Sequence, residues 1–324
     1  MPQHTPATPA RQQLAALLAL FAGALAIGAS GIFVRWSETG PTATAFWRGA
    51  FALPFLGAWV AITRTRRARA AALPDTTPAI AGPSASPLEP LFLWAGVFFA
   101  GDLALWHSSL LLTSIAASTL EANCAPIFVT LAAWALWRER PRLGFLVALA
   151  CAFGGMLLIL APKLGAGGHA LLGDALGLGT ACFYAAYILA VTSLRSRHGT
   201  AIVMFNTTLV FTVLLLPLAL GQKFLPDSVH GWLVLAGCAL CAQVIGQSLI
   251  AYAFAHLPAT FGSVGLYVQV VAAAVYAWLL LDERLSPVQL VGGVVVLAAI
   301  ALARSFQPAR ASGQSSTPRH GDSP

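Results

Sequence analysis

Two long stretches of this chain follow the same pattern, and together they decide the fold. The first begins at Ala125 and reads APIFVTLAAWALWRERPRLGFLVALACAFGGMLLIL; the second begins at Gln269 and reads QVVAAAVYAWLLLDERLSPVQLVGGVVVLAAIALA. Each contains a long apolar run, a Glu-Arg pair, a proline and a second apolar run. Glu283 follows its counterpart Glu139 by 144 residues. The sequence is therefore a duplication.

The composition places the chain in a membrane. Of its 324 residues, 58% are hydrophobic and only 9% are charged, and the mean hydropathy is +0.78. These values exclude an ordinary soluble domain. A helix that crosses a bilayer needs about 20 mostly apolar residues. The chain offers ten such windows, near residues 14–34, 42–62, 91–112, 115–137, 142–161, 171–193, 201–220, 231–254, 259–281 and 286–304.

These windows predict an all-α integral membrane protein of ten transmembrane helices, arranged as two five-helix repeats. The strands of a membrane barrel would be shorter and would alternate in polarity, so helices are expected. Because five is odd, the second repeat enters the bilayer upside down. Inverted repeats of this kind are common in secondary transporters.

The expected domain organisation follows from the same windows. We expect an amino-terminal tail at 1–13, a first repeat at 14–161 with a flexible loop at 63–90, and a linker at 162–170. A second repeat at 171–304 and a disordered tail at 305–324 complete the chain. Ala24-Leu25-Ala26 resembles a signal-peptide cleavage site. The apolar run continues past it to Val34, which favours a retained first span.

The distribution of positive charges predicts the orientation. Cytoplasmic loops hold most of the Lys and Arg residues of a membrane protein. With the amino terminus inside, thirteen of the eighteen fall on the cytoplasmic side. We therefore expect a multi-pass protein of the plasma (cell inner) membrane with both termini in the cytoplasm. The net charge of +7 needs no nucleic-acid partner to explain it, and the expected partner of the spans is the lipid bilayer.

Enzyme-like motifs have simpler explanations in this sequence. Cys238 and Cys241 form a CxxC, but no second Cys or His pair supplies further metal ligands, so neither a metal nor a cofactor is expected. The glycines between Gly173 and Gly179 follow no strand and instead favour close approach of two spans. Catalytic arrangements of Ser, His and Asp are also missing. The sequence does not favour an enzyme.

The informative residues are polar side chains inside the apolar spans. A charge at the bilayer centre costs about 2.5–3.5 kcal/mol on insertion scales, so such residues face protein or a water-filled cavity. Asp102 and Trp106 share one face of the third span, and Glu121 and Asn123 lie on the fourth. The candidate substrate-binding residues are Trp106, His107, Glu121, Asn123, Tyr184, Tyr187, Gln247, Tyr267 and Gln269.

Charge and shape suggest a role for each candidate. Glu121 lacks an obvious partner, so we expect it to bind a proton or a substrate amine. The amides of the set would hydrogen-bond polar groups, and the aromatic rings would form apolar or cation-attracting walls. Arg48 and Asp102 form a predicted intramembrane charge pair. Mutual neutralisation and a transport role are both open for that pair.

The two Glu-Arg corners have a structural interpretation. Glu139-Arg140-Pro141 and the stretch from Glu283 to Pro287 both precede an apolar run. Proline at the first helical position, preceded in the second copy by Ser286, is a signal for the start of a helix. We expect corners here and not ion sites.

Several of these features resemble the drug/metabolite transporter superfamily, and most closely its EamA-type ten-helix permeases. They are Phe46-Trp47-Arg48 in span two, Ala125-Pro126 in span four and the two Glu-Arg corners, and the resemblance covers about residues 14–304. It implies a central cavity lined by spans 1, 3, 4, 6, 8 and 9. The second copy departs from the pattern at Val270, where the first has Pro126, and at Asn206, near the place of Arg48.

The expected function is therefore secondary active transport of a small molecule. We expect an exporter that moves a metabolite such as an amino acid by alternating access, with protons as the candidate coupling ion. The alternative is a multidrug or toxic-cation efflux permease of the same fold, which would use Glu121 as its cation site. A membrane-embedded enzyme or scaffold is a third class, and it would show no substrate flux.

Overall fold

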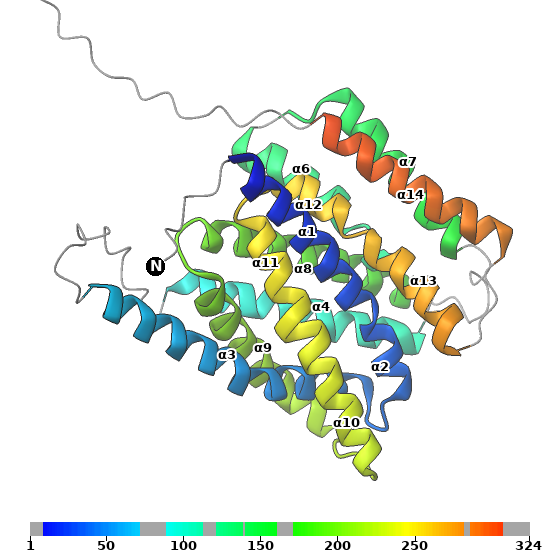
Figure 1. Cartoon of the computed structure of the whole chain (residues 1–324). Helices are drawn as coiled ribbons and strands as arrows, with labels where there is room; N and C mark the ends of the chain where they lie inside the picture. Colours follow the sequence, from blue (N-terminus) through cyan, green and yellow to red (C-terminus); the bar gives the residue numbers. More distant parts are fainter. Residues whose placement is uncertain are drawn as a thin grey trace, which may run out of the picture.

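The computed structural model is an assembly of helices packed side by side (Figure 1). It describes residues 9–71, 89–112, 121–138, 140–160, 171–281 and 286–306. The first half of the chain contributes α1 (Pro9–Gly28), α2 (Ser30–Trp36), α3 (Pro41–Ala71), α4 (Pro90–Leu112), α6 (Ala125–Trp137) and α7 (Leu143–Leu160). The second half contributes α8 (Leu171–Arg195), α9 (Thr200–Leu220), α10 (Val229–Cys238), η2 (Ala239–Gln247), α11 (Ser248–Phe254), α12 (Ala259–Gly265), α13 (Val268–Leu281) and α14 (Pro287–Ser305).

Many of these helices are long and apolar enough to cross a membrane. Eight segments of the described chain meet that description: Arg11–Trp36, Pro41–Arg69, Leu143–Leu160, Leu171–Arg195, Thr200–Leu220, Val229–Phe254, Ala259–Leu280 and Pro287–Ser305. Two shorter apolar helices, Pro90–Trp106 and Ala125–Leu136, join them. The described residues form helices and no strand, which confirms the predicted helical, multi-pass membrane class. The count of ten spans and the inversion of the second repeat stay predictions.

One predicted boundary needs correction. The expected loop at 63–90 begins too early, because α3 continues to Ala71. The apolar run ends near residue 62, but the Arg and Ala residues that follow are strong helix formers and extend the helix. Residues 72–88, the linker at 162–170 and most of the two tails lie outside the described residues, as do Glu139 and Glu283.

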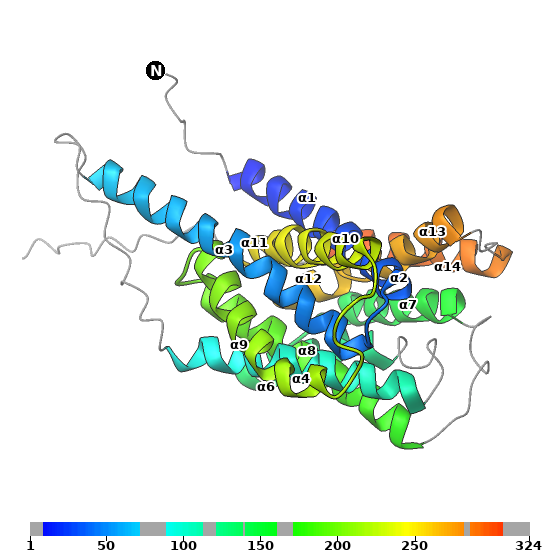
Figure 2. The ribbon, with the colours of Figure 1, turned by 90° about the horizontal axis from the view of Figure 1, so that it is seen from below.

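Helices from the two halves pack against each other throughout the bundle. α3 and α9 run antiparallel, since the Gly40 amide donates to the Lys223 carbonyl at 2.9 Å at one end, and Gly199 lies against the Arg67 side chain at the other. α4 packs on α8, where Gly101 lies against the ring of Phe183. Seen from below, α1 and α4 lie on opposite sides of the bundle (Figure 2).

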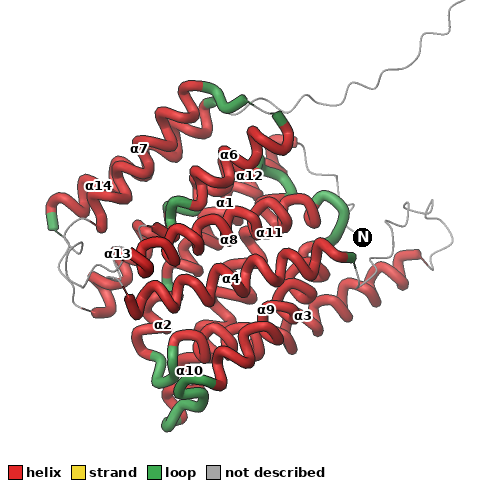
Figure 3. The backbone as a smooth tube through the Cα atoms, turned by 180° about the vertical axis from the view of Figure 1, so that it is seen from behind, coloured by secondary structure: helices red, strands yellow, loops and turns green. Residues whose placement is uncertain are grey.

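α7 and α14 form a pair at one edge of the bundle (Figures 1 and 3). Their backbones meet at Gly155 and Gly292: a Cβ added at Gly155 would lie 2.9 Å from the Gly292 carbonyl oxygen. Small residues allow such close approach of helices in membranes. α14 begins with a capping box between Ser286 and Gln289 and with Pro287 in its first turn. The predicted helix start at this corner is confirmed.

Candidate functional site

Two helical spans each contain a short turn at corresponding positions of the duplicated stretches, where i+3 hydrogen bonds interrupt the α-helical pattern; we call each turn a helix break. In the fourth span a turn at Asn123 and Cys124 precedes α6, which has Pro126 in its first turn. In the ninth span a turn at Leu266 and Tyr267 separates α12 from α13. Tyr267 follows Asn123 by 144 residues, the spacing of the two Glu-Arg pairs. The two copies therefore share a helix break.

The two breaks contact each other. The Tyr267 hydroxyl donates a hydrogen bond to the Asn123 backbone carbonyl at 2.9 Å, and Tyr267 is buried. Inside a bilayer, carbonyls freed by a helix break need partners within the protein. The second break occurs without proline, since Val270 stands where the first copy has Pro126. Tertiary contacts accompany it: Gly265, at the end of α12, lies against the side chain of Leu20.

Glu121 lies two residues before the turn at Asn123 and faces the beginning of α8. Its carboxylate occupies the space that a side chain at position 177 would need: a Cβ on Gly177 would lie about 2.9 Å from the Glu121 Cβ and 3.0 Å from its carboxyl carbon. Asp174, one turn earlier on α8, is in hydrogen-bonding and electrostatic contact with Glu121. Two carboxylates have only acceptor atoms, so a hydrogen bond between them requires a shared proton.

Asp174 is not among the site residues predicted from the sequence. It lies at the amino end of an apolar run, among glycines, where a carboxylate also serves as an ordinary first-turn residue. The charge of Glu121 inside an apolar span indicated that it needs a partner, but the sequence did not identify which residue that partner is. Both carboxyl groups keep a buried oxygen without a hydrogen-bond partner, Oε2 of Glu121 and Oδ1 of Asp174.

A second polar group surrounds Arg48 on α3. Its Nε atom donates to Oε1 of Gln243 at 3.1 Å, and Nε2 of Gln243 donates to the hydroxyl of Thr208 at 2.9 Å. The guanidinium carbon lies 5.7 Å from the centroid of the Phe99 ring. Arg48 is 8% exposed, and Gln243 and Thr208 are fully buried. One hydrogen-bonded chain thus links α3, η2 and α9 inside the bundle.

The η2 segment is a π-helix, and it carries both glutamines of the eighth span. Gln243 and Gln247 are buried on it. π-Helical turns are rare and occur often at functional sites, because the extra residue in the turn changes the direction of the side chains. Gly246 in the same segment lies against Gly23 and Ile27 of α1. The spacing of the glutamines indicated a polar face, but it did not reveal the π-helix.

Asp102 and two tyrosines complete this group. Asp102, half-buried in the middle of α4, lies within electrostatic range of Arg48 and of Tyr184. Within the described part of the chain, no ion pair joins Asp102 to Arg48. The predicted pair is therefore an electrostatic interaction without a direct salt bridge among the described residues, and the Nε donor of Arg48 is taken by Gln243. Tyr184 contacts Gln247 through its hydroxyl.

The rings in this region form a stacked series. Tyr184 stacks on Tyr187 with centroids 6.1 Å apart, and Tyr187 stacks on Phe99 at 4.5 Å. Since Arg48 lies over Phe99, the series ends at the guanidinium. Trp106 is half-buried one turn from Asp102, whereas the side chain of His107 lies outside the described residues.

The predicted site residues thus fall into two groups. Glu121, Asn123 and Tyr267 meet at the helix breaks together with Asp174, and Gln269 follows the second break, where its carbonyl faces Gly28 of α1. Asp102, Tyr184, Tyr187 and Gln247 surround Arg48 together with Gln243 and Phe99. Among the described residues, no three His, Cys, Asp or Glu side chains gather where they could hold a metal ion.

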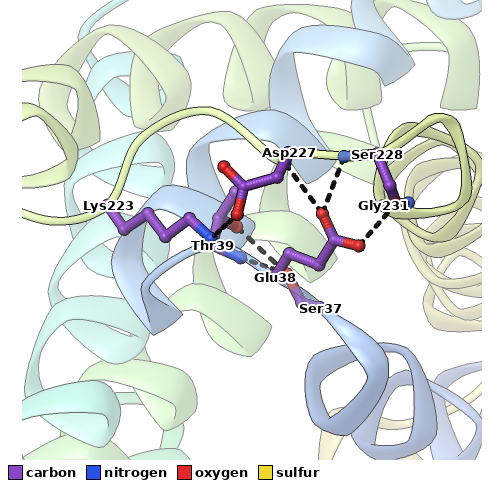
Figure 4. A network of polar contacts seen from close by, with 7 residues as sticks. All are labelled: Ser37, Glu38, Thr39, Lys223, Asp227, Ser228 and Gly231. Atoms are coloured by element: carbon purple, nitrogen blue, oxygen red, sulfur yellow. Dashed lines mark hydrogen bonds and ion pairs between the residues drawn. The ribbon is translucent and has the colours of Figure 1, made fainter.

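At one end of the bundle, Glu38 binds the loop before α10 (Figure 4). Its carboxylate accepts hydrogen bonds from the amides of Asp227 at 2.8 Å and Ser228 at 3.0 Å, and from the Ser228 hydroxyl. The Ser228 hydroxyl and these amides hold the pKa of Glu38 below its ordinary value of 4.5. We call this contact of the 37–40 loop with residues 227 and 228 the Glu38 clamp.

A second clamp closes the opposite end of α3 and α9. Glu89, just before α4, accepts from Arg197 Nη1 at 2.7 Å and pairs with His198 Nε2 in the loop that follows α8. Arg195 donates to the carbonyls of Ala251 and His198, which ties this loop to α11. This Glu89 clamp also joins the first half of the chain to the second.

The apolar helices and their enclosed charges define a multi-pass membrane protein with a polar interior. The model of the EamA-like transporter family matches residues 14–161 and 171–305. The chain therefore belongs to the EamA-like transporter family, as the resemblance predicted, and it is a membrane transporter for a small-molecule substrate.

Known relatives agree with this assignment. The chain is 27% identical over 218 residues to a pseudopaline exporter, CntI, of Pseudomonas aeruginosa (strain UCBPP-PA14). The aligned residues cover 67% of this chain and 75% of the exporter. The chain is 30% identical over 172 residues to a riboflavin transporter of Vibrio cholerae, covering 53% of this chain and 52% of that transporter. A crystal structure with 16% sequence identity has the same fold, with a TM-score of 0.69 over 94% of this chain and all of the other.

Proposed function

We propose that this protein is a secondary active transporter that exports a small metabolite, such as an amino acid, across the inner membrane by alternating access. The observation that carries the proposal is the contact between the two broken spans beside Glu121 and Asp174. Corresponding irregular turns in the spans of the two halves of a transporter point to its binding site, and here a backbone carbonyl, that of Asn123, is bonded across the halves beside two buried carboxyl groups. The Pseudomonas aeruginosa relative is an exporter, and this supports export as the direction of transport.

The proposal includes ten spans in two inverted repeats with both termini in the cytoplasm. Three observations support the inversion. The helix breaks are 144 residues apart, α3 and α9 are antiparallel, and each end of that pair carries a clamp between the halves. Under inversion, the Glu38 clamp joins the loop between spans one and two to the loop between spans seven and eight. The Glu89 clamp joins the loop between spans six and seven to the loop between spans two and three.

In the proposed mechanism, the clamps release in turn. Release of the Glu38 clamp opens the outer end of α3 and α9, and release of the Glu89 clamp opens the cytoplasmic end. The proton shared by Glu121 and Asp174 provides the coupling. A hydrogen bond between two carboxyl groups is kept only while the proton is present, so loss of the proton separates the charges and moves the first turns of α8 relative to the break in the fourth span.

Flux into proteoliposomes tests this function. Radiolabelled amino acids and amines are offered with and without a pH gradient to the wild type and to Glu121→Gln. We expect flux of at least one compound to follow the gradient and to be lost in Glu121→Gln, because the amide cannot release a proton. Arg66→Gln is the control, since it neutralises an exposed side chain of α3 that belongs to neither clamp.

The outcomes separate the possible mechanisms. Flux that ignores the gradient and survives Glu121→Gln would leave a facilitator and contradict proton coupling. Flux restricted to hydrophobic cations would support the alternative multidrug permease. If no compound crosses in any preparation, secondary transport of this class of substrate is wrong.

A further inference from the structure

Arg48 is a buried cation with an unused donor. Its residue is 8% exposed, and its Nη2 atom has no hydrogen-bond partner in the described structure. Burying a charged group without full hydrogen bonding is unfavourable, and an unsatisfied charged donor costs more than a neutral one. Nε is held by Gln243, so the guanidinium is fixed in orientation while Nη2 stays available. Such an arrangement is suited to an anionic ligand group.

The nearest carboxylate does not neutralise Arg48 directly. Asp102 lies within electrostatic range of the guanidinium, yet no ion pair joins the two side chains within the described chain. A purely structural pair of opposite charges inside a membrane would be in contact, because contact recovers part of the cost of burying both. Two opposite charges that interact without an ion pair can both be satisfied by a ligand that carries both signs.

Aromatic rings lie beside these two charges. Tyr187 stacks on Phe99, the ring that lies beneath Arg48, and Tyr184 continues the stack. Tyr184 and Tyr187 each lie within electrostatic range of both Arg48 and Asp102. A ligand held between the charges therefore has flat apolar surface next to it, together with the amide of Gln247.

We propose that Arg48 and Asp102 are the two poles of a binding site for a zwitterionic amino acid, an inference that rests on the transport function proposed above. Nη2 of Arg48 donates to the substrate carboxylate, and Asp102 accepts from the substrate ammonium. The side chain of the substrate lies against Tyr184 and Tyr187. Gln243 is a positioning residue, because it holds the guanidinium from η2 and links substrate binding to the π-helix.

Charge balance argues against simpler ligands at this site. An amine without a carboxylate would leave Arg48 unpaired, and a carboxylic acid without an amine would leave Asp102 unpaired. Sites with buried polar groups reject analogues that leave those groups without a partner. A phosphorylated ligand would call for several cations, whereas Arg48 is the only Lys or Arg among the described residues that form this group.

Three probes with the same ring test the proposal: phenylalanine, phenethylamine and 3-phenylpropionate. The three compounds are offered together to wild-type protein in proteoliposomes, and the uptake of each is measured without a pH gradient and with one. We expect the wild type to prefer phenylalanine over both analogues. Arg48→Gln should reduce the preference for phenylalanine over phenethylamine about 10- to 100-fold, the effect of one charge-assisted hydrogen bond. Asp102→Asn should reduce the preference over 3-phenylpropionate by a similar factor.

Each preference is the ratio of two uptake rates measured in one preparation. A partly misfolded variant lowers both rates and leaves their ratio unchanged. Arg48→Lys keeps the charge and should keep part of the preference, and Arg66→Gln, an exposed arginine of α3, should keep all of it. A ratio unchanged in Arg48→Gln would overturn the zwitterion site and leave transport standing. Flux of phenethylamine or 3-phenylpropionate with none of phenylalanine would also overturn it. Absence of any flux would overturn the transport function as well.

Discussion

Glu121 and Asp174 show how one small residue can create a site. Their contact depends on Gly177, because any side chain there would occupy the position of the Glu121 carboxylate. Proton sharing between two carboxyl groups requires their oxygens to approach closely. The glycine is therefore part of the proposed coupling device, although it contributes no chemical group.

Gly177→Ala should displace the Glu121 carboxylate from Asp174 and abolish gradient-driven flux as Glu121→Gln does. Overpacking of this kind costs about 1–3 kcal/mol, which thermal unfolding in detergent would detect. Gly31→Ala is the control, since a Cβ there meets no atom within 4 Å. Normal coupled flux in Gly177→Ala would show that the carboxyl pair is not needed.

Glu38 predicts a pH dependence at one end of the molecule. Its pKa is lowered in the folded protein, so the contribution of its clamp to stability is present above the ordinary value of 4.5 and is lost as the pH falls through the lowered pKa. The difference in Tm between wild type and Glu38→Gln should therefore be largest near neutral pH and should close in acid. Asp227→Asn should not remove this dependence. A difference that stays constant with pH would contradict the prediction.

At the scale of elements, helix breaks and helix crossings follow different rules. The break in the fourth span has Pro126 in the following turn, a local cause, whereas the break in the ninth span has none and occurs where α12 packs on Leu20 of α1. The crossing of α7 and α14 depends on backbone contact at Gly155 and Gly292. Both features place rigid elements around the polar interior.

Two neighbouring glycines of α7 allow a matched test of that crossing. Gly155→Ala would bring a Cβ within 2.9 Å of both the Gly292 carbonyl oxygen and the Val296 amide, which are backbone atoms that cannot rotate away. We expect a loss of about 1–3 kcal/mol in the free energy of unfolding. Gly154→Ala meets no atom within 4 Å and should stabilise the helix by about 0.5–1 kcal/mol. Equal effects of the two substitutions would show that α7 and α14 do not cross here.

At the scale of the whole molecule, the two clamps join the halves of the chain at opposite ends of α3 and α9. In the structure described here, both clamps are formed, and Arg48 is buried between them along α3. The proposed alternating access requires that each clamp open while the other stays closed. Loosening one clamp should therefore not loosen the other.

Glu89→Gln should loosen one end alone. The substitution removes the charge that holds Arg197 and His198, so amide hydrogen exchange should become faster at residues 195–199 and stay unchanged at residues 221–231. Glu38→Gln should give the reverse pattern, and each variant is the control for the other. Faster exchange at both ends in either variant would show that the clamps open together.

The sequence by itself determined that this is a membrane protein. It also determined the positions of most spans and the polar residues that they carry. Span length follows from the thickness of the bilayer, and helix starts such as Ser286-Pro287 follow from local chemistry, so both can be read from neighbouring residues. The duplication and the family resemblance were equally visible, because they are patterns of the chain and not of its packing.

Only the tertiary structure decided which polar side chains meet. Asp174 as the partner of Glu121, and Gln243 in place of Asp102 as the hydrogen-bond partner of Arg48, join residues from helices far apart in the sequence. The π-helix at η2 and the proline-free break at Tyr267 likewise occur where helices from the two halves pack. Apolar runs determine where the chain crosses the bilayer. Which polar side chains meet depends on how each helix is rotated and which helices it contacts, and the spacing of residues along the sequence does not give this information.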